Sequence, residues 1–386
     1  MVTFLHTSDW HLGRMLYGRS LLEDQEYFLD RVFFPAVEQV RPDAVLLAGD
    51  IFDRPVAPVE AVRLFDSVLD RLHRLGIPLA AIAGNHDSPD RLALGAGILR
   101  ESGVYLATNL DDALTPLRFG KGKDAVDVTL LPYFDPAEAR AWTGDTSIRG
   151  THEAACAVLD RVRAGLSPDA AQVLVAHSFV AGSQTCDSET AVSVGGSGEV
   201  GLSAFEGFAY VALGHLHGPQ AVGKTLRYSG SPLKYSFDEE HHRKSMALVQ
   251  LDTGRVSVRL LPVQPLREVC SLCGTLGELL AQGEQAPRED YLFCRLTDPV
   301  PVYLPAEQLR PYYPNLLSIH CDWLTGDGGI SETEPLRRQM RRGKLDPALV
   351  LEEFFRQICG DEAAPDETAW FVQMFGQRED GKEDAR

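Results

Sequence analysis

Ala81-Ile82-Ala83-Gly84-Asn85-His86-Asp87 is the stretch that decides the fold of this chain. Its apolar residues have the length and composition of a buried strand, and the glycine ends that strand. Three polar side chains follow without a spacer, and they offer an amide oxygen, an imidazole and a carboxylate. The stretch therefore predicts a strand that ends at a chemically active position.

Four other segments repeat this format, in which a run of strand-forming residues ends in His, Asp or Asn. They are Leu5–His11, Leu46–Asp53, Leu174–His177 and Val211–His217. In layered α/β proteins, ligand sites form just beyond the carboxyl ends of the strands. Five such endings can converge on one place, and the residue types gathered there predict a metal site.

Helical patterns separate these strands. Apolar residues repeat at helical spacing across Val59–Leu75, and a second helix is expected over Arg91–Arg100, loosened by Gly95. Ser20-Leu21-Leu22-Glu23 has the spacing of a capping box that opens a further helix, which Pro35 should kink or end. Strands and helices that alternate in this way predict an α/β fold with a largely parallel sheet covered on both faces.

The prolines at Pro262 and Pro265 indicate a domain boundary. We expect a first domain over residues 1–262, a small α+β module over 263–324, and a linker with a C-terminal helical segment over 325–375. Asp346-Pro347 has the pattern of a helix start in that segment. Residues 376–386 are nearly all polar and are expected to be disordered. Residues 180–201, rich in Gly and Ser, predict a long loop.

The composition is that of a globular protein, with 44% hydrophobic and 24% charged residues in a chain of 386. A net charge of −18 argues against a protein that simply coats nucleic acid, although it is compatible with a nuclease. Seven scattered cysteines do not suggest a disulfide framework, and the Cys270-Ser271-Leu272-Cys273 spacing has no second pair. We expect a cytoplasmic protein, and no apolar run approaches the length of a membrane helix.

Each candidate ligand also has a structural alternative. Asp9 and His11 alternate on a segment expected to be extended, so both side chains project the same way, but a surface turn also explains them. Asp50 follows a buried strand, where a helix N-terminus or a metal must compensate its charge.

The remaining candidates have similar alternatives. Asn85 is also a turn former, and His177 is also a core histidine. Gly214-His215-Leu216-His217 is a more specific indication of a metal site, because it predicts two imidazoles on one side of an extended segment. As an ordered set, D-x-H, G-D-x-x-D, G-N-H-D, H and G-H-x-H are specific.

This ordered set resembles the signature of the calcineurin-like metallophosphoesterases, from Met1 to about Asp252. Within that superfamily the chain is most similar to the SbcD family of bacterial nuclease subunits. The segments that carry this similarity are His6–Gly13, Gly49–Asp53, Gly84–Ser88, Val194–Gly196, Gly214–Gln220 and Tyr228–Pro232. The resemblance implies a layered β-sandwich flanked by helices, with a small capping domain and C-terminal helices.

The resemblance also implies a ligand set. The first metal would take Asp9, His11 and His217, the second would take Asn85, His177 and His215, and Asp50 would bridge them. The mixed carboxylate, amide and imidazole donors favour two manganese ions over magnesium, with iron or zinc as alternatives.

His86 is not assigned to a metal, and it is the candidate general acid for the leaving sugar oxygen. We expect the Asp53 carboxylate to hydrogen-bond His86 and hold its tautomer. The alternative for His86 is a structural role in capping a helix. Asp87 is expected to cap the next helix or to support the ligand loop.

The family resemblance implies a DNA nuclease that acts in DNA repair, recombination and replication at the nucleoid. It would be a 3′–5′ exonuclease on double-stranded ends and an endonuclease on single strands or hairpins.

The resemblance also implies protein partners. The C-terminal segment would dock on the SbcC ATPase. The helices over Val59–Leu75 and Arg91–Arg100 would form a homodimer contact or pack within the chain. Candidate DNA contacts are Arg14, Arg19 and Arg54, which are equally explained as solvated arginines, and the basic run over residues 337–344 serves DNA or the partner.

Two other functions are compatible with the motifs. A phosphoesterase for nucleotides or phosphoproteins uses the same ligands, but the extra module over Val263–Trp323 argues against a small substrate. A non-catalytic adaptor could keep the fold and regulate an ATPase, but all seven ligand positions are filled.

Overall fold

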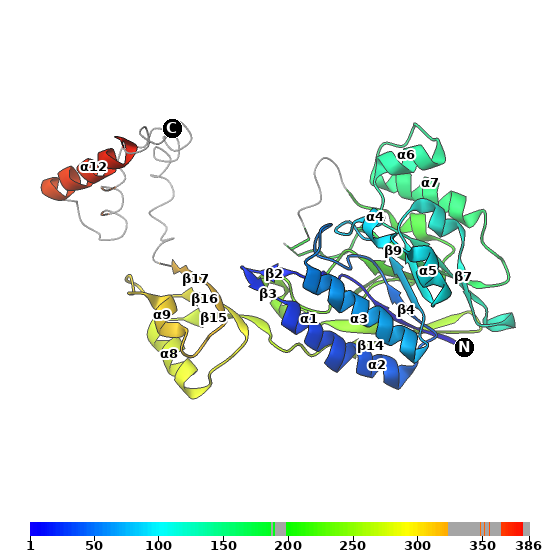
Figure 1. The fold of residues 1–386 in the computed structure, drawn as a ribbon, viewed down its shortest axis with the longest axis horizontal. Helices are drawn as coiled ribbons and strands as arrows, with labels where there is room; N and C mark the ends of the chain where they lie inside the picture. Colours follow the sequence, from blue (N-terminus) through cyan, green and yellow to red (C-terminus); the bar gives the residue numbers. More distant parts are fainter. Residues whose placement is uncertain are drawn as a thin grey trace. The chain divides into compact units, whose positions relative to one another are not determined.

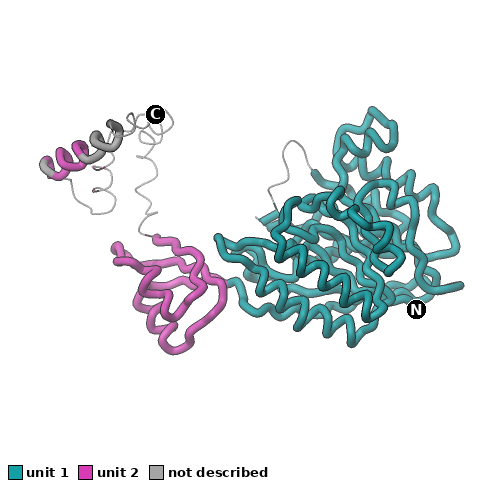
Figure 2. The backbone as a smooth tube through the Cα atoms, in the orientation of Figure 1, with its two compact units in different colours: residues 1–269 teal, residues 270–386 magenta. Residues whose placement is uncertain are grey.

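The structure is a computed structural model that describes residues 1–186, 188–189, 198–322, 348, 351, 355 and 364–380. The chain divides into two compact units, Met1–Val269 and Cys270–Arg386 (Figure 2). Strand β14 (Arg255–Pro262) belongs to the first unit, and the division follows it at Val269.

The first unit contains a six-stranded sheet with the order β14-β13-β1-β4-β5-β6. Its other strands are β1 (Val2–Thr7), β4 (Ala44–Leu47), β5 (Leu79–Ile82), β6 (Val104–Ala107) and β13 (Ser245–Asp252). Strands β1, β4, β5 and β6 run parallel, while β13 and β14 form an antiparallel pair at one edge. The carboxyl ends of three ligand-bearing strands therefore lie at one end of this sheet.

A second six-stranded sheet has the order β11-β12-β10-β9-β8-β7. Its strands are β7 (Leu117–Phe119), β8 (Val126–Leu131), β9 (Ala171–His177), β10 (Tyr210–Gly214), β11 (Gln220–Val222) and β12 (Leu226–Tyr228). The central strands β8, β9, β10 and β12 are parallel. The strands that end in His177 and Gly214 are direct neighbours in this sheet.

The two sheets pack face to face around one apolar layer, in which Phe4 and Leu46 of the first sheet join Val173 and Ala212 of the second. Helices α6 (Pro136–Thr143) and α7 (Thr151–Arg163) cover the other face of the second sheet. Figure 1 shows α1, α2 and α3 lying along the first sheet. The layered α/β sandwich implied by the family resemblance is thus confirmed. The single sheet predicted from the alternation of strands and helices is instead two sheets, each covered by helices on one face.

The helix predictions hold where apolar periodicity is strong. Helix α3 covers Val59–Leu75 as predicted. Residues 91–100 instead form two short helices, α4 (Pro89–Leu92) and α5 (Ala96–Glu101), because Gly95 adopts a left-handed conformation with φ 74°.

The helix expected after Ser20 has a different start and interior. Helix α1 (Leu22–Phe28) has Leu21 at its N-cap without a side-chain cap, so the capping-box prediction is wrong; Ser20 instead pairs in the hairpin of β2 (Met15–Leu16) and β3 (Arg19–Ser20). A π-helical turn over Leu29–Phe33 leads into α2 (Phe34–Val40), whose first turn holds Pro35. The helical run therefore continues past the proline, which was expected to kink or end it.

The second unit contains a three-stranded sheet of β15 (Val269–Gly274), β16 (Tyr291–Leu296) and β17 (Leu316–Cys321). Helices α8 (Leu276–Gln285) and α9 (Pro305–Leu309) pack on it around Leu292, Leu309 and Tyr313. Helix α12 (Pro365–Asp380) extends into residues 376–380, which were expected to be disordered.

Several predictions lie outside the described residues: the linker at 325–335, the helix start at Asp346-Pro347, the basic run at 337–344 and the Val194–Gly196 motif. Among the helices that the structure describes, none combines the length and the apolar character needed to span a membrane.

Candidate metal centre

All seven candidate ligands lie at carboxyl ends of strands, and the two sheets contribute nearly equally. From the first sheet, Asp9 and His11 follow β1, Asp50 follows β4, and Asn85 follows β5. From the second sheet, His177 ends β9, and His215 and His217 follow β10. Hydrogen bonds across the sandwich join the two groups, since the His215 backbone N–H donates to Asp9 Oδ1 at 2.9 Å.

The backbone at four of these positions is left-handed. The φ angles are 53° at Asp9, 43° at His11, 50° at Asp50 and 105° at His215. Asp9 and His11 therefore do not alternate on an extended segment, and His215 and His217 do not project on one side of one; those predictions of local geometry are wrong. Non-glycine residues in this region each cost about 1–3 kcal/mol and are held by the surrounding structure. Two backbone hydrogen bonds help to hold the left-handed conformation of Asp9 and His11. The Asp9 N–H donates to the Gly49 carbonyl at 3.1 Å, and the His11 N–H donates to the Asp50 carbonyl at 2.9 Å.

One set of candidate ligands consists of Asp9, His11 and His217, whose ligand atoms lie within 4.8 Å of one another. The Nε2 atoms of His11 and His217 face each other at 3.3 Å. Two ligands that bind one ion at about 2.1 Å and at right angles lie about 3 Å apart. The spacing of these nitrogens is therefore that of neighbouring ligands on one ion.

The other set consists of Asn85, His177 and His215. Asn85 Oδ1 lies 2.9 Å from His177 Nε2 and 3.1 Å from His215 Nδ1. His177 Nδ1 donates to the Ala48 carbonyl at 2.9 Å, which directs its Nε2 toward the site. Asp50 Oδ2 lies between the two sets, 3.5 Å from His11 Nε2 and 3.3 Å from His177 Nε2.

The carboxylates of this centre are buried without a lysine or arginine partner among the described residues. Asp9 and Asp50 are 0% and 2% exposed, and neither forms an ion pair with a Lys or Arg of the described residues. Burial raises the pKa of Asp9 to about 6. Burial alone would also raise the pKa of Asp50, but the imidazoles of His177 and His11 more than offset it and hold the pKa well below its usual range.

The histidines have correspondingly different pKa values. Burial lowers the pKa of His11 well below its usual value and lowers that of His215 to about 3, which leaves both rings neutral and able to coordinate. Burial also lowers the pKa of His177, but Asp50 outweighs it and raises that pKa to about 9. The centre thus attracts positive charge, and divalent ions fit a donor set of carboxylate, amide and imidazole groups.

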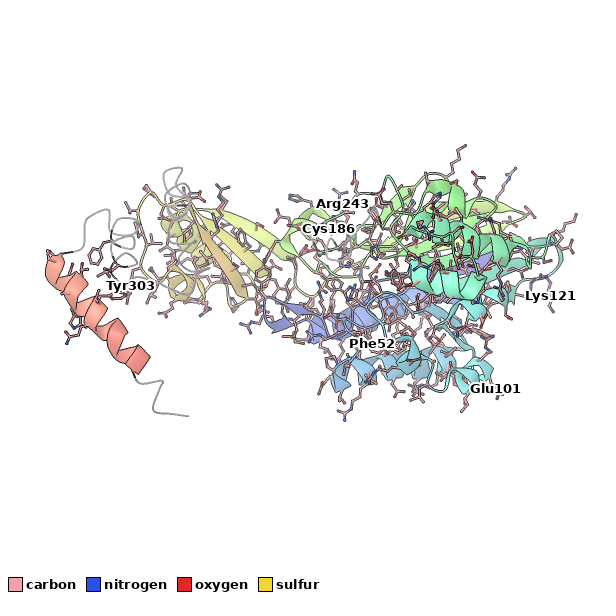
Figure 3. The ribbon with its side chains drawn as sticks, turned by 90° about the horizontal axis from the view of Figure 1, so that it is seen from above. Phe52, Glu101, Lys121, Cys186, Arg243 and Tyr303 are labelled. Carbon is pink, nitrogen blue, oxygen red and sulfur yellow. The ribbon has the colours of Figure 1, made fainter. Side chains whose placement is uncertain are left out.

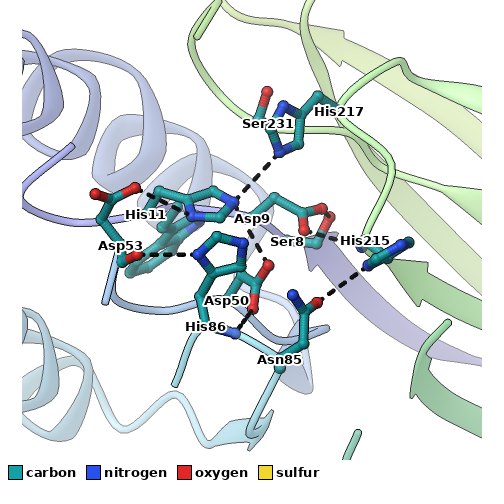
Figure 4. Close-up of polar contacts among 12 residues, drawn as sticks. Ser8, Asp9, His11, Asp50, Asp53, Asn85, His86, His215, His217 and Ser231 are labelled. Atoms are coloured by element: carbon teal, nitrogen blue, oxygen red, sulfur yellow. Dashed lines mark hydrogen bonds and ion pairs between the residues drawn. The ribbon is translucent and has the colours of Figure 1, made fainter. Parts of the chain in front are cut away.

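His86 and Asp53 lie beside the first set. The His86 backbone N–H donates to Asp50 Oδ1 at 2.9 Å, and its Nδ1 donates to the main-chain carbonyl of Asp53 at 2.9 Å (Figure 4). The prediction that the Asp53 carboxylate hydrogen-bonds His86 is therefore wrong, because the acceptor is the Asp53 backbone carbonyl. That carboxylate accepts from Arg14 at 2.7 Å and lies 3.7 Å from His11 Nδ1. The Asp53 residue still orients His86, but through its backbone.

Asp87 supports the ligand loops and does not cap the next helix, whose N-cap is Ser88. Its carboxylate accepts the backbone N–H groups of Ile51 at 3.1 Å, Phe52 at 2.9 Å and Gly84 at 2.9 Å. It therefore joins the loop after β4 to the loop after β5. Burial and the nearby Asp50 raise the pKa of Asp87 to about 6.

Two residues near the centre escaped the sequence analysis. Glu239 lies in a run of charged residues that is typical of an exposed surface, yet its side chain is 0% exposed and meets His217 Nδ1 at 3.1 Å. The Tyr235 ring packs edge-on against His11 and His217, with centroids 5.4 Å from each. Neither position belongs to a motif that would have identified it.

A cavity of about 880 Å³ lies next to the second set, with His177 and His215 in its wall. Tyr133, Phe134 and Phe179 also line it. Of the arginines considered for DNA contact, Arg14 is largely covered by its bond to Asp53, with 20% of its side chain exposed, whereas Arg54 is 60% exposed.

Gly84 provides a test of how closely the two ligand loops approach. A Cβ atom there would lie 2.2 Å from Asp50 Oδ1 and 2.3 Å from the Asp50 backbone nitrogen. We expect Gly84→Ala to lower the free energy of unfolding by about 1–3 kcal/mol, as overpacking does, and to weaken metal binding because Asp50 must move. Gly165→Ala is the matched control, since its added atom would make only an ordinary contact, 3.6 Å from the Val162 carbonyl oxygen. Equal urea midpoints for the two variants would contradict this reading.

Comparison with known proteins agrees with this geometry. Residues 2–219 match the family model of the calcineurin-like phosphoesterases. The chain is 31% identical over 360 residues to the SbcD component of the nuclease SbcCD from Staphylococcus saprophyticus subsp. saprophyticus, and the match covers 92% of this chain and 93% of the relative. The chain therefore belongs to the calcineurin-like phosphoesterases and, within them, to the SbcD family of nucleases, so that it is a metal-dependent phosphodiester hydrolase.

Proposed function

We propose that this chain is a DNA nuclease that uses two manganese ions, cutting double-stranded DNA from its ends as a 3′–5′ exonuclease and single strands or hairpins as an endonuclease. The observation that carries the proposal is the position of the Asp50 carboxylate between two ligand sets, Oδ2 at 3.5 Å from His11 and 3.3 Å from His177. A relative that is named a nuclease and matches nearly the whole chain supports DNA as the substrate.

In this proposal, seven side chains bind the two metal ions. Asp9, His11 and His217 would hold one ion, and Asn85, His177 and His215 would hold the other. Asp50, which lies between the two sets, would serve both. When bound, the two ions neutralise the phosphodiester charge and lower the pKa of a water molecule so that attack occurs at neutral pH. Asp9 and Asp50 form no ion pair with a lysine or arginine of the described residues, so bound ions would supply the positive charge that the substrate meets.

His86 is the general acid of this proposal. Its Nδ1 is committed to the Asp53 carbonyl at 2.9 Å, so the protonated ring presents Nε2–H to a leaving sugar oxygen. The Asp53 carboxylate positions Arg14 and faces His11, whereas the Asp53 backbone carbonyl accepts the hydrogen bond from His86.

We further propose that the small unit binds DNA as a capping domain and that the C-terminal segment, residues 325–375, binds the SbcC ATPase. In the small unit, Tyr303 is 81% exposed and offers an aromatic face (Figure 3). In helix α12, Trp370 is 63% exposed, as expected for a helix whose partner is another chain. The name of the Staphylococcus relative describes one component of a complex, which supports an assembly of this kind.

The substrate assignment is tested with wild-type protein and Mn²⁺ on a hairpin duplex and on a chromogenic phosphodiester. We expect cleavage of the DNA, and no cleavage above the metal-free background by Asp50→Asn, which removes the carboxylate common to both sets. Activity on the small diester alone would assign the chain to small-substrate phosphoesterases. Absence of bound manganese under replete conditions would instead indicate a non-catalytic adaptor.

The role of His86 predicts a separation of binding from turnover. We expect His86→Ala to lower the rate of cleavage by about 10²–10⁴-fold while the affinities for DNA and Mn²⁺ stay nearly unchanged, because a general acid acts on the leaving group. His241→Ala is the control, since that side chain is 89% exposed. A loss of affinity as large as the loss of rate would assign His86 to binding instead.

A homodimer contact through α3 and the α4–α5 region is part of the proposal. Leu94 is 84% and Ile98 77% exposed, and Val62 of α3 is 48% exposed, which is unusual for large apolar residues without a partner. We expect the double variant Leu94→Glu and Ile98→Glu to halve the mass measured by light scattering. Leu260→Glu, at a 47% exposed position on β14, should leave the mass unchanged. A monomeric wild-type chain would overturn the dimer.

A further inference from the structure

The side of His217 that faces away from the candidate metal centre contacts a buried ion pair. His217 Nδ1 lies 3.1 Å from Glu239 Oε1, and Glu239 Oε2 forms an ion pair with Lys244 Nζ. Lys244 Nζ also donates to the His217 carbonyl at 2.8 Å and to Ser231 Oγ at 2.8 Å. The ion pair therefore contacts His217 at two places: Glu239 contacts its ring and Lys244 contacts its backbone carbonyl.

Both charges are almost completely removed from solvent. Glu239 is 0% exposed and Lys244 is 6% exposed. Buried ion pairs are poor sources of stability, because desolvation offsets their attraction, whereas they are effective at holding one geometry. Further donors reach the same carboxylate, including Ser188 Oγ at 2.9 Å, so Glu239 has a single orientation.

The other histidines of the two sets have no such support among the described contacts. His177 Nδ1 donates to a backbone carbonyl, and His11 Nδ1 has no hydrogen-bond partner. His215 faces Asn85 with Nδ1, and no carboxylate of the described residues forms a hydrogen bond with its Nε2. His217 is thus the one histidine of the described sets whose remote nitrogen meets a carboxylate within hydrogen-bond distance. A carboxylate acceptor fixes the tautomer of a ligating imidazole and increases its basicity.

We propose that Glu239 and Lys244 are positioning residues for the first metal: Glu239 accepts the His217 Nδ1–H and directs the Nε2 lone pair toward the ion, and Lys244 holds Glu239 in place. This inference rests on the proposed two-ion function. Its consequence is selective, because the pair strengthens the set of Asp9, His11 and His217 and leaves the set of Asn85, His177 and His215 unaffected.

The experiment measures Mn²⁺ affinity in two single-site backgrounds. His215→Ala leaves the first set as the complete one, and His11→Ala leaves the second. We expect Glu239→Gln to raise the Mn²⁺ dissociation constant 10–100-fold in the His215→Ala background, the usual scale for losing such a partner. In the His11→Ala background the constant should change less than twofold. The single variant Glu239→Gln is also compared with the wild-type chain by electron paramagnetic resonance at an intermediate Mn²⁺ concentration. We expect the wild type to give the spectrum of a coupled manganese pair and the variant to give the spectrum of a single ion.

Two further variants keep the result interpretable. Because Glu239→Gln leaves the Lys244 ammonium unpaired, Glu239→Gln with Lys244→Met removes both charges and should show the same selective loss in a folded protein. Asp127→Asn on β8 deletes another buried carboxylate, which is 4% exposed and paired with Arg118 of β7, and it should leave both dissociation constants unchanged. Equal weakening in both backgrounds, or none in either, overturns the inference while the two-ion function stands. A wild-type chain that binds no manganese overturns both.

Discussion

Two carboxylates enclosed in the protein, with imidazoles but no lysine or arginine of the described residues beside them, are the constraint on which the rest of this structure depends. Asp9 and Asp50 are 0% and 2% exposed, and their nearest neighbours are imidazoles and backbone N–H groups. Folding such groups is unfavourable unless positive charge reaches them. The centre is therefore built to receive cations, and the surrounding loops make sense as the framework that keeps these two groups in place.

That framework uses backbone contacts more than side-chain packing. Asp87 joins two ligand loops through three N–H groups, and the Ala48 carbonyl orients His177. The same carbonyl leaves no room beside Gly214, where a Cβ would lie 1.8 Å from it. The glycines that precede the ligands are thus needed for close approach of neighbouring chain segments.

The sequence predicted the composition of the centre better than its geometry. Runs of strand-forming residues that end in Asp, Asn or His predicted the convergence, because the ends of neighbouring parallel strands meet at one edge. The left-handed backbone at Asp9 and His215 and the contact of His86 with a carbonyl were missed, since both depend on partners far along the chain. Helix α3 followed from periodicity, whereas Ser20 showed capping spacing and nevertheless joined a hairpin, because a local signal yields to strand pairing. Glu239 could not be recognised, because a charged run gives no sign of burial.

The distribution of ligands between the sheets has a mechanical consequence. Asp9, His11, Asp50 and Asn85 extend from one layer of the sandwich, and His177, His215 and His217 extend from the other. An ion bound by residues of both layers would cross-link the two sheets, because sliding one sheet over the other would break its coordination bonds. Loading the centre with metal then adds to the resistance of the whole domain to heat, by the linkage that couples any native-state ligand to folding.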